Sequence, residues 1–449
     1  MRRTSRSLFA AAVLSGLLLS LPVTAQAAAT SDPAQAAAGW LARQVDSSGL
    51  IAGQSGPDRN VTALAVLALG SVDRGGPAAR RAVEALAGNV DASVKDSQGN
   101  DRPGALGTLI QAAVVTGRDP RAFGGVDLVA RLAATKRGTG TDAGLYGVQD
   151  PKFDGAYRQS LALLGLAAVG MTDADAVAWL RGQQCPDGGW EAYRADESAP
   201  CTPTNAAAFA GEDTNSTAIA AQALAALAAP PSVSPLGFLD AAQNSDGGFG
   251  FLAGTSTDAN STALSMQAII AFGEDPTAGR WSDAQGDNPL TALLMLRLGC
   301  SSAEPSRGAF AYQPETDGSL SPNALATVQV VPALARDPYP IGRATFTDEE
   351  PTLSCPRAQQ GSPTPSPASS SSSTGAPSPR ASVAPSAAST PPTLVVDDFG
   401  DTLPDTGPGQ GSDIGRLALH ALGLLSFGCA ALVAASSLAA TRGAGRAQD

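Results

Sequence analysis

The sequence predicts an all-α domain in which six helical hairpins close into a ring. Two observations support this prediction. A unit made of an apolar helix, a glycine-containing turn and a second helix recurs along the chain, and only 16% of the residues are charged, which suits tightly packed helices. An isolated hairpin cannot bury its apolar face, whereas a closed ring of hairpins can. We therefore expect the second helices to line the inside and the first helices to form an outer wall.

Two copies of the unit, residues 176–227 and 237–272, define its pattern. Without a gap, Trp179, Leu180, Gln184, Gly188 and Trp190 of the first copy match Phe238, Leu239, Gln243, Gly247 and Phe249 of the second. The second helices open with helix-capping residues, Asp213 and Asp258. A weaker N-terminal copy keeps the spacing, with Val45 where the glutamine would stand. Its second helix starts with Asp58-Arg-Asn60-Val-Thr62, in register with Asp258-Ala-Asn260-Ser-Thr262.

The remaining elements follow from the same apolar periodicity, taken in order. The predicted pairs of outer and inner helix are 34–45 with 60–69, 77–94 with 104–116, 122–136 with 156–169, the two strong copies, and 290–298 with 323–335. Glutamines inside the inner helices are expected to form hydrogen bonds between helices rather than to contact a ligand. Residues 338–358 are expected to extend the domain beyond its last hairpin.

This pattern resembles the QW-type repeats (prenyltransferase/squalene oxidase repeats) of the terpene cyclase and prenyltransferase superfamily. The resemblance covers roughly residues 33–337 and implies an α/α toroid with an open mouth. It also implies that the glutamine after the outer helix and the aromatic residue after the turn tie one hairpin to the next. A shared fold does not imply a shared reaction.

The N-terminus, residues 1–27, has the features of a secretory signal peptide. Arg2 and Arg3 form a basic start, residues 8–21 are apolar, and Ala25-Gln26-Ala27 fits a cleavage site. The alternative is an N-terminal membrane anchor, but the apolar run is short for a membrane span. We expect an exported protein.

The C-terminal part predicts attachment to a cell wall. Residues 359–402, rich in Ser, Pro, Thr and Ala, are expected to form a disordered spacer. Residues 403–449 begin with Leu403-Pro404-Asp405-Thr406-Gly407, continue with an apolar stretch at 417–440, and end with arginines. About 24 residues at ~1.5 Å each can span a bilayer. This order resembles the LPxTG sorting signal of Gram-positive surface proteins, which implies cleavage by a sortase after Thr406 and linkage to peptidoglycan. A simple membrane anchor is the alternative.

Four cysteines lie in the part expected outside the cell. An even number of exported cysteines favours disulfides over metal binding. Four cysteines allow three pairings, and pairing nearest neighbours closes the shorter loops. The predicted bridges are Cys185–Cys201 and Cys300–Cys355.

Several chemistries do not fit this composition and these motifs. A net charge of −12 argues against nucleic acid. A terpene cyclase protonates an alkene with the middle Asp of a D-x-D-D-T motif, and Asn215 and Asn260 stand at the corresponding places, where an amide cannot act as an acid. Asp213, at a helix start, is expected to be ionised. The single histidine, His420, lies outside the ring, so a prenyltransferase zinc site is not expected. We expect no cofactor and no metal.

Polar and aromatic residues are expected to gather at one mouth of the ring. The polar candidates are Asp58, Asn60, Asp213, Asn215, Asp258, Asn260 and Asn323, and the aromatic candidates are Trp190, Tyr193, Phe249 and Phe251. The Asp and Asn residues are explained either as helix caps alone or as caps that also bind a ligand whose apolar body enters the ring. Three functions remain open: non-catalytic binding of a small, largely apolar ligand, a surface interaction or structural role, and a cyclase-like enzyme.

Overall fold

A computed structural model describes residues 29–356, except 54–55, 148–154, 195–198 and 206–210. The predicted signal peptide, spacer, sorting motif and apolar span at 417–440 lie outside the described residues. Within them the chain is mostly helical, with thirteen α-helices and a few short strands and turns of 3₁₀-helix. Among the described helices, none combines the length and the apolar character that crossing a bilayer requires.

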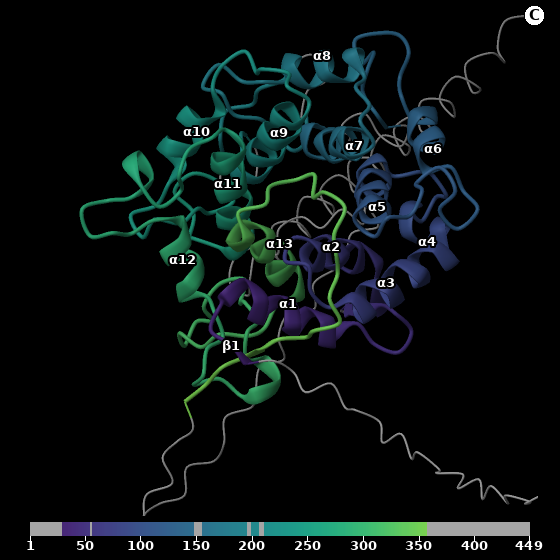
Figure 1. Cartoon of the computed structure of the whole chain (residues 1–449). Helices are drawn as coiled ribbons and strands as arrows, with labels where there is room; N and C mark the ends of the chain where they lie inside the picture. The colour runs from purple at the N-terminus through teal and green to yellow at the C-terminus, as the bar shows by residue number, and fades with distance from the viewer. Residues whose placement is uncertain (1–28, 54–55, 148–154, 195–198, 206–210, 357–449) are drawn as a thin grey trace, which may run out of the picture.

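The helices alternate between an outer and an inner position (Figure 1). The outer helices are α1 (Pro33–Gln44), α3 (Gly76–Gly88) with α4 (Val90–Val94), α6 (Leu128–Ala134), α8 (Ala174–Gly182), α10 (Pro235–Ala242) and α12 (Pro289–Met295). The inner helices are α2 (Arg59–Gly70), α5 (Pro103–Val115), α7 (Ala156–Ala168), α9 (Thr214–Ala226), α11 (Ala259–Ala271) and α13 (Ala324–Ala335). Short strands form two pairs that the all-α prediction did not include, β1 (Ala29–Thr30) with β4 (Thr352–Leu353) and β2 (Ile51–Gly53) with β3 (Gly56–Asp58).

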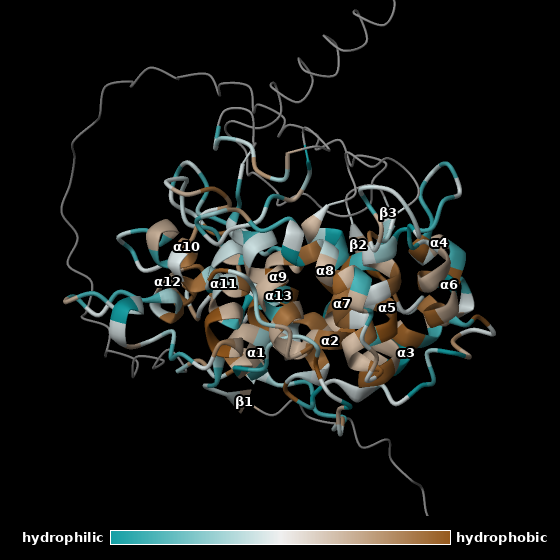
Figure 2. Cartoon of the chain, turned by 90° about the horizontal axis from the view of Figure 1, so that it is seen from above, coloured by the Kyte–Doolittle hydropathy of each residue, from teal (hydrophilic) through white to brown (hydrophobic). Residues whose placement is uncertain are grey.

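The six inner helices form a closed ring. Each packs against the next in the order α2, α5, α7, α9, α11, α13, and α13 packs against α2. Each outer helix packs on the inner helix of the preceding hairpin, and α1 closes the circle on α13. The predicted double ring of helices, an α/α toroid, is therefore confirmed. Hydrophobic residues are concentrated in the helices and hydrophilic residues in the loops (Figure 2).

Two outer elements differ from their predicted bounds. The expected helix 77–94 is two helices, because Asn89 leaves the helical conformation and its side chain caps α4 by accepting the Ala92 N–H. The expected helix 122–136 begins only at Leu128. Gly124 and Gly125 both have positive φ, which interrupts a helix, and Asp127 then caps α6 through the Ala130 N–H.

The closest approach between inner helices lies between α5 and α7. A Cβ atom on Gly107 would lie 2.1 Å from the Leu161 carbonyl oxygen, so only glycine fits there. Gly165 of α7 faces Gly107 in the same contact. Small residues thus allow the inner ring to be narrow, and most inner-helix side chains are buried on all sides.

Glutamines connect neighbouring hairpins in the way that the repeat resemblance implies. Gln184 donates to Val233 O at 2.7 Å and accepts from Val233 N at 3.0 Å, and Val233 precedes the next outer helix. Gln243 donates to Trp281 O at 3.1 Å in the same manner. Inside the ring, Gln222 donates to Leu264 O of the neighbouring inner helix, and Gln267 donates to Gln329 O. The expected hydrogen bonds between helices are therefore present at Gln222 and Gln267.

Residues 338–356, which we call the strap, cross the end of the ring where the inner helices finish (Figure 1). Tyr339 N donates to Gln222 Oε1 at 3.0 Å, and Ala344 N donates to Val115 O at 3.0 Å. Further along, the strap exchanges backbone hydrogen bonds with residues 73–76, and β4 then pairs with β1. The strap therefore contacts α9, α5, the α2–α3 turn and the N-terminal strand, and it closes this end.

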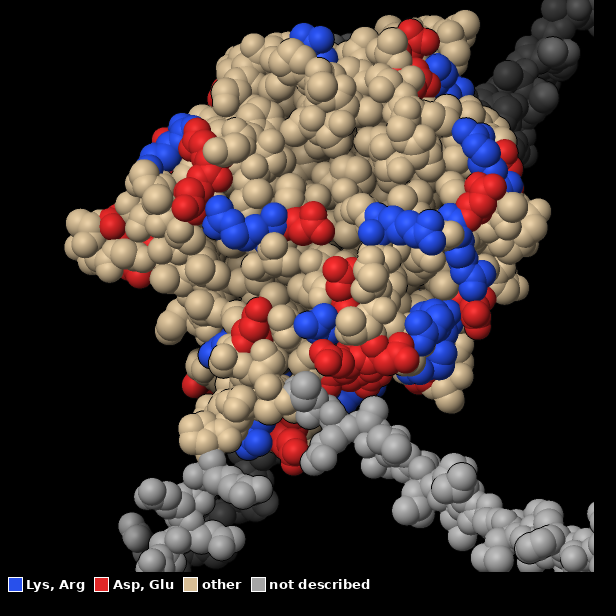
Figure 3. Space-filling model, in the orientation of Figure 1, with Lys and Arg blue, Asp and Glu red and all other residues tan. Residues whose placement is uncertain are grey.

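The surface of the strap end carries paired charges. Arg74 contacts Glu349 at 3.4 Å, and Arg80 contacts Asp348 at 2.9 Å. Figure 3 shows basic and acidic side chains side by side around this face and a large uncharged area above them. Exposed ion pairs of this kind are each worth about 1 kcal/mol or less. The core and the strap contacts, rather than surface charges, therefore stabilise the fold.

Candidate functional site

The end of the ring opposite the strap, where the inner helices begin, is the mouth. Four inner helices start with an Asp or Asn side chain that accepts the backbone N–H three residues later. The donors are Val61 for Asp58, Ser216 for Asp213, Ser261 for Asp258 and Ala326 for Asn323, at 2.7–2.8 Å. These four residues are thus helix N-caps, which is one of the two roles expected for them.

A threonine four residues after each of these caps fixes the preceding turn. Its Oγ1 accepts the N–H of the residue that follows the glycine turn, at 2.9–3.0 Å. The pairs are Thr62 with Ile51, Thr217 with Trp190, Thr262 with Phe249, and Thr327 with Phe310. Gln159 takes this role in the third hairpin, accepting from Tyr146 N. Sequence reasoning missed this role, although the constant spacing of cap and threonine was visible.

Two of the aromatic residues expected at the mouth lie elsewhere. Trp190 and Phe249 are fully buried. The Trp190 indole donates to Leu180 O of its outer helix at 2.8 Å, and the Phe249 ring packs near Trp281. Both rings sit beneath the turns because their own backbone N–H groups are held by the threonines. They hold the wall together and do not line the mouth.

The other two aromatic residues lie nearer the mouth. Phe251 O accepts the Thr214 N–H at 3.0 Å, which joins the start of α9 to the next hairpin. Tyr312 O accepts the Ala259 N–H in the same way for α11. Tyr193 is half-buried, and the Arg158 guanidinium lies 5.9 Å from its ring centroid. Backbone links between consecutive hairpins thus fix the positions of the helix starts.

The asparagines of the repeated motif have no comparable structural role. Asn215 and Asn260 are 4% and 2% exposed, and their Oδ1 atoms have no hydrogen-bond partner within the described residues. Asn60, in register with them, is half-buried. In the pattern Asp-x-Asn-x-Thr, Asp caps the helix and Thr anchors the turn, so the structure accounts for both. A buried carbonyl oxygen without a donor costs about 1–3 kcal/mol. The asparagine is the member that the fold does not explain.

Burial raises the pKa of Asp213 and of Asp258 to about 7, against hydrogen bonds that favour the ionised form. Asp213 accepts from Ser216 N at 2.7 Å and from Ala192 N at 3.1 Å, and Asp258 accepts from Ser261 N and Oγ, both at 2.7 Å. The helix start therefore does not hold Asp213 fully ionised, contrary to the expectation from its position. Desolvation outweighs the helix N–H groups because the carboxyl is 1% exposed.

A buried ion pair beside the mouth was not foreseen. Arg194 contacts Asp142 at 2.6 Å, the Trp179 indole donates to the same carboxylate at 3.2 Å, and the guanidinium lies 5.1 Å from the Trp179 ring centroid. Burial opposes ionisation of Asp142, but the hydrogen bonds from Arg194 and Trp179 prevail, so its pKa is lowered. This cluster joins the third hairpin to the fourth. The charges satisfy each other, as a structural pair does.

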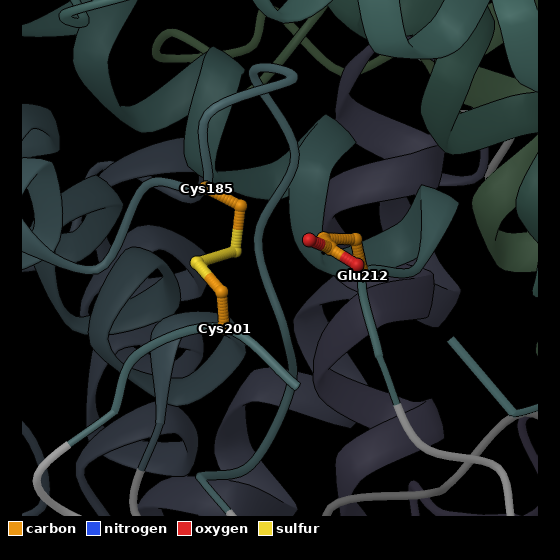
Figure 4. Close-up of side chains that lie close together, drawn as sticks. All are labelled: Cys185, Cys201 and Glu212. Atoms are coloured by element: carbon orange, nitrogen blue, oxygen red, sulfur yellow. A yellow bond between two sulfur atoms is a disulfide. The ribbon is translucent and has the colours of Figure 1, made fainter. Parts of the chain in front are cut away.

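Both predicted disulfides are present. Cys185 pairs with Cys201 and Cys300 pairs with Cys355. The carboxylate of Glu212 lies beside the first bridge (Figure 4), and these three residues are the one grouping of possible metal ligands among the described residues. Since the two sulfurs are bonded to each other, they are not thiolates and do not form a metal site.

No protein-family model matches the sequence, and no curated protein matches it. Solved structures share the arrangement of helices at low similarity. A protein from Actinoplanes is 16% identical with a TM-score of 0.46, and the match covers 68% of this chain and 98% of that one. An unsaturated glucuronyl hydrolase from Bacillus sp. GL1 is 15% identical with a TM-score of 0.45, covering 68% and 96%.

An ent-copalyl diphosphate synthase from Streptomyces platensis is 17% identical with a TM-score of 0.36. That match covers 67% of this chain but only 50% of the synthase. Identities this low show at most a shared fold, and TM-scores below 0.5 support no argument about function. The function must therefore be argued from this chain's own residues.

Proposed function

We propose that this chain is an exported, cell-wall-anchored surface protein that displays its toroid as a non-catalytic binding module. The observation that carries the binding role is the asparagine repeated at the mouth. Asn60, Asn215 and Asn260 recur in register, while the capping Asp and the anchoring Thr of the same motif are used by the fold. Polar groups without a structural role, placed together at one end of a scaffold, are typical of a ligand site.

Export and anchoring rest on sequence features and are consistent with two disulfides, which form and persist outside the cytoplasm. In this proposal a sortase cuts between Thr406 and Gly407 and links Thr406 to peptidoglycan. The described chain ends at Pro356, after the strap, at the end of the ring opposite the mouth. A chain held from its C-terminal side would therefore present the mouth outward.

Anchoring is tested with Thr406→Ala. We expect this variant to leave the wall fraction and to appear in the membrane fraction or the medium, because a sortase has no threonine carbonyl in the required context. Wall digests of cells expressing the native chain or the variant are compared by immunoblot. Equal amounts in both digests would show that the tail is a simple membrane anchor.

Binding is tested with the secreted toroid, residues 28–358, since every contact described above lies within this range. Ligand carried through purification is detected by mass spectrometry after denaturation. We expect the triple variant Asn60→Ala/Asn215→Ala/Asn260→Ala to lose it and the exposed-amide control Gln98→Ala/Gln285→Ala to keep it. Equal amounts of ligand in both variants would place the site elsewhere and contradict the proposal.

The packing below the mouth favours one alternative, a structural or interaction role. The inner-helix side chains two turns and more below the caps are almost completely buried, so the lower part of the ring is filled by side chains. A filled interior suits a rigid display domain that binds through its surface. The mass-spectrometric comparison separates the two, because a purely structural domain carries no ligand that depends on the asparagines.

The raised pKa values of Asp213 and Asp258 favour a second alternative, a cyclase-like enzyme, because buried protonated carboxyls can donate protons. Against this, each carboxyl already accepts backbone N–H groups as a cap. Incubation of the secreted toroid with squalene and with shorter polyprenyl diphosphates, followed by gas chromatography, decides the matter. A cyclic product that disappears in Asp213→Asn would establish the enzyme.

A further inference from the structure

We propose that the mouth binds an uncharged amphipathic molecule, one with an apolar body and at least one hydroxyl or amide group that donates a hydrogen bond. This inference rests on the proposed binding function and specifies the chemistry of the ligand. It excludes carboxylates, phosphates and ammonium ions as ligands of this site.

The first step identifies the side chains that face the ring axis. Counting from the N-cap, positions 2, 6 and 9 lie on one face of a helix. Position 9 of α9 is Gln222, which contacts the strap residue Tyr339 where the strap crosses the ring. Asn215, at position 2, therefore lies on the inward face, two turns above Gln222. The same relation holds between Asn260 and Gln267 in α11.

The pattern of exposure supports this assignment. In α7 the half-buried residues of the first three turns are Tyr157 and Leu161, at positions 2 and 6. In α9 and α11 the residues at position 2, Asn215 and Asn260, are buried at 4% and 2% exposed. Because outer helices cover the other side of each inner helix, the partial exposure of Tyr157 and Leu161 comes from the inside of the mouth. The mouth is thus open at Asn60, Tyr157 and Leu325 of position 2 and at Leu161 of position 6, whereas the other residues at these positions and those at position 9 are buried.

The second step is the charge of this surface. The six residues at position 2 are Asn60, Gly104, Tyr157, Asn215, Asn260 and Leu325. Those at position 6 are three leucines, an isoleucine, a threonine and a glutamine. None of the twelve is charged. A charged ligand group placed among them would lose its hydration without gaining a counter-charge, which costs several kcal/mol.

The third step is the hydrogen-bonding character of the surface. Asn215 Oδ1, Asn260 Oδ1 and Gln329 Oε1 are buried and have no partner within the described residues. These three oxygens are acceptors, so the ligand group that pairs with them is a donor, and a neutral hydroxyl or amide N–H supplies one. The NH2 groups of the same side chains are donors, which a ligand hydroxyl or amide oxygen can accept. Leu325 at position 2 and Leu161 at position 6 are half-buried and provide apolar contact for the rest of the molecule.

Charged side chains also lie around the mouth, but most of them form hydrogen bonds or ring contacts within the protein. Asp213 and Asp258 hold backbone N–H groups as caps, and Arg158 lies by the Tyr193 ring. Asp58 caps α2, and its neighbour Arg59 is half-buried at position 1, off the inward face. These groups are the reason why the test must include an anion and a cation.

The test uses four probes with one eight-carbon chain: 1-octanol, octanamide, octanoate and octylammonium. Their binding to the secreted toroid is measured by saturation-transfer NMR at pH 7.5, with titration to obtain dissociation constants. We expect the two neutral probes to bind at least about tenfold more tightly than the two ions. Asn215→Ala/Asn260→Ala should abolish this preference for a donor-bearing neutral probe. Thermal unfolding of the variant checks that it is folded.

Each outcome decides one of the two claims. Ions that bind as tightly as the neutral probes, with binding lost in the double variant, would overturn the neutral-ligand inference and leave the mouth as the site. Neutral binding that is unchanged in the folded double variant, or no binding of any probe, would overturn the proposed site itself. A second variant, Leu161→Glu, places a charge at position 6. This variant should bind octylammonium more tightly and 1-octanol more weakly than the native toroid does. An unchanged order of affinities would show that position 6 does not face the ligand.

Discussion

At the strap end of the ring, Tyr339 is 5% exposed and its backbone N–H is held by Gln222, whereas at the mouth Asn60, Tyr157 and Leu161 are half-buried. The same six inner helices produce both ends. At the strap end, added chain covers the helix ends and exchanges hydrogen bonds with α5, α9 and the α2–α3 turn. At the mouth, each cap and each of the threonines four residues after it serves its own hairpin, and the Oδ1 atoms of Asn215 and Asn260 between them have no partner among the described residues.

This contrast separates stability from recognition. Side chains at the strap end are in contact with the core, so their removal should destabilise the fold. The Oδ1 atoms of Asn215 and Asn260 make no hydrogen bond within the described residues, so removal of these side chains should affect binding more than stability. Five substitutions test this division, from the largest expected change in the free energy of unfolding to the smallest.

Tyr339→Ala should destabilise the protein most, by about 3–5 kcal/mol, because it removes a large side chain from a closed environment. Tyr339→Phe is the matched control. The Tyr339 hydroxyl is buried and has no partner within the described residues, so its removal should leave stability unchanged or slightly raised. Urea unfolding of the secreted toroid measures both. A Phe variant as unstable as the Ala variant would mean that the hydroxyl, not the ring, holds the strap.

Replacing the Cys300–Cys355 bridge with serines should cost about 2–4 kcal/mol, since the bridge closes a loop with a sequence separation of 55 residues. Removal of the Cys185–Cys201 bridge should lower the free energy of unfolding by less, because this bridge closes a shorter loop, with a sequence separation of 16 residues. Thermal unfolding of both double variants gives the order. The opposite order would indicate that strap contacts alone hold the C-terminal residues.

Thr262→Val should cost about 1–3 kcal/mol, because the buried Phe249 N–H loses its acceptor. Valine keeps the shape of threonine, so packing is conserved. Thr277→Val, at a half-buried threonine whose hydroxyl donates to the exposed Asp275, is the control for the loss of a hydroxyl. Chemical unfolding measures both, and equal small changes would show that the turn is fixed by other contacts.

Asp258→Asn should change the pH dependence of stability. The folded-state pKa of about 7 lies above the usual value near 3.9, so the folded state binds the proton more tightly. The native protein should therefore lose stability as the pH rises from about 4 to 7 and level off above that. The variant keeps a capping oxygen and should show a smaller loss, since Asp213, whose pKa is also raised, still contributes. Unfolding curves from pH 4 to 8, with the exposed Asp240→Asn as control, measure it; parallel curves for native and Asp258→Asn would refute the raised pKa.

Asn260→Ala should have the smallest effect, because no hydrogen bond to its oxygen is lost and the removal of an unpaired buried oxygen offsets the packing lost with a side chain that is 2% exposed. Asn260 lies two residues before Thr262, so the variants Asn260→Ala and Thr262→Val compare two polar side chains of one motif. Differential scanning calorimetry resolves the difference. A loss above 1 kcal/mol would show that the asparagine is structural and would weaken the case for a ligand.

The ring of hairpins could be predicted because its signals are local and repeated. Helix caps such as Asp213 and Asp258, the glycine turns, and glutamines such as Gln184 recur at fixed spacing, and the two disulfides follow from loop length. The bounds of α6 were missed because a glycine pair can either end a helix or lie within a turn. Predicting the helix caps, the glycine turns and the glutamines requires no knowledge of contacts distant in the sequence.

The candidate site was only partly predictable. The sequence placed Trp190 and Phe249 at the mouth because they follow the turns, but their backbone bonds to threonines direct the rings into the wall. The pKa of Asp213 depends on burial by neighbouring hairpins, which a helix-start argument ignores. Tyr339 closes the ring from a segment with no helical pattern, so its role appears only in three dimensions.

The Cys300–Cys355 disulfide also has a mechanical consequence. For a chain tethered through its C-terminal side, tension enters the domain at Pro356 and reaches Cys355 first. The bridge carries it covalently to Cys300, just after α12, so the hydrogen bonds of the strap do not bear the full load. The strap residues between Asp337 and Ser354 lie within the covalent loop and cannot be drawn out while the bridge is intact. A pull on the tether is thus borne by the outer wall, and the closed end keeps its shape.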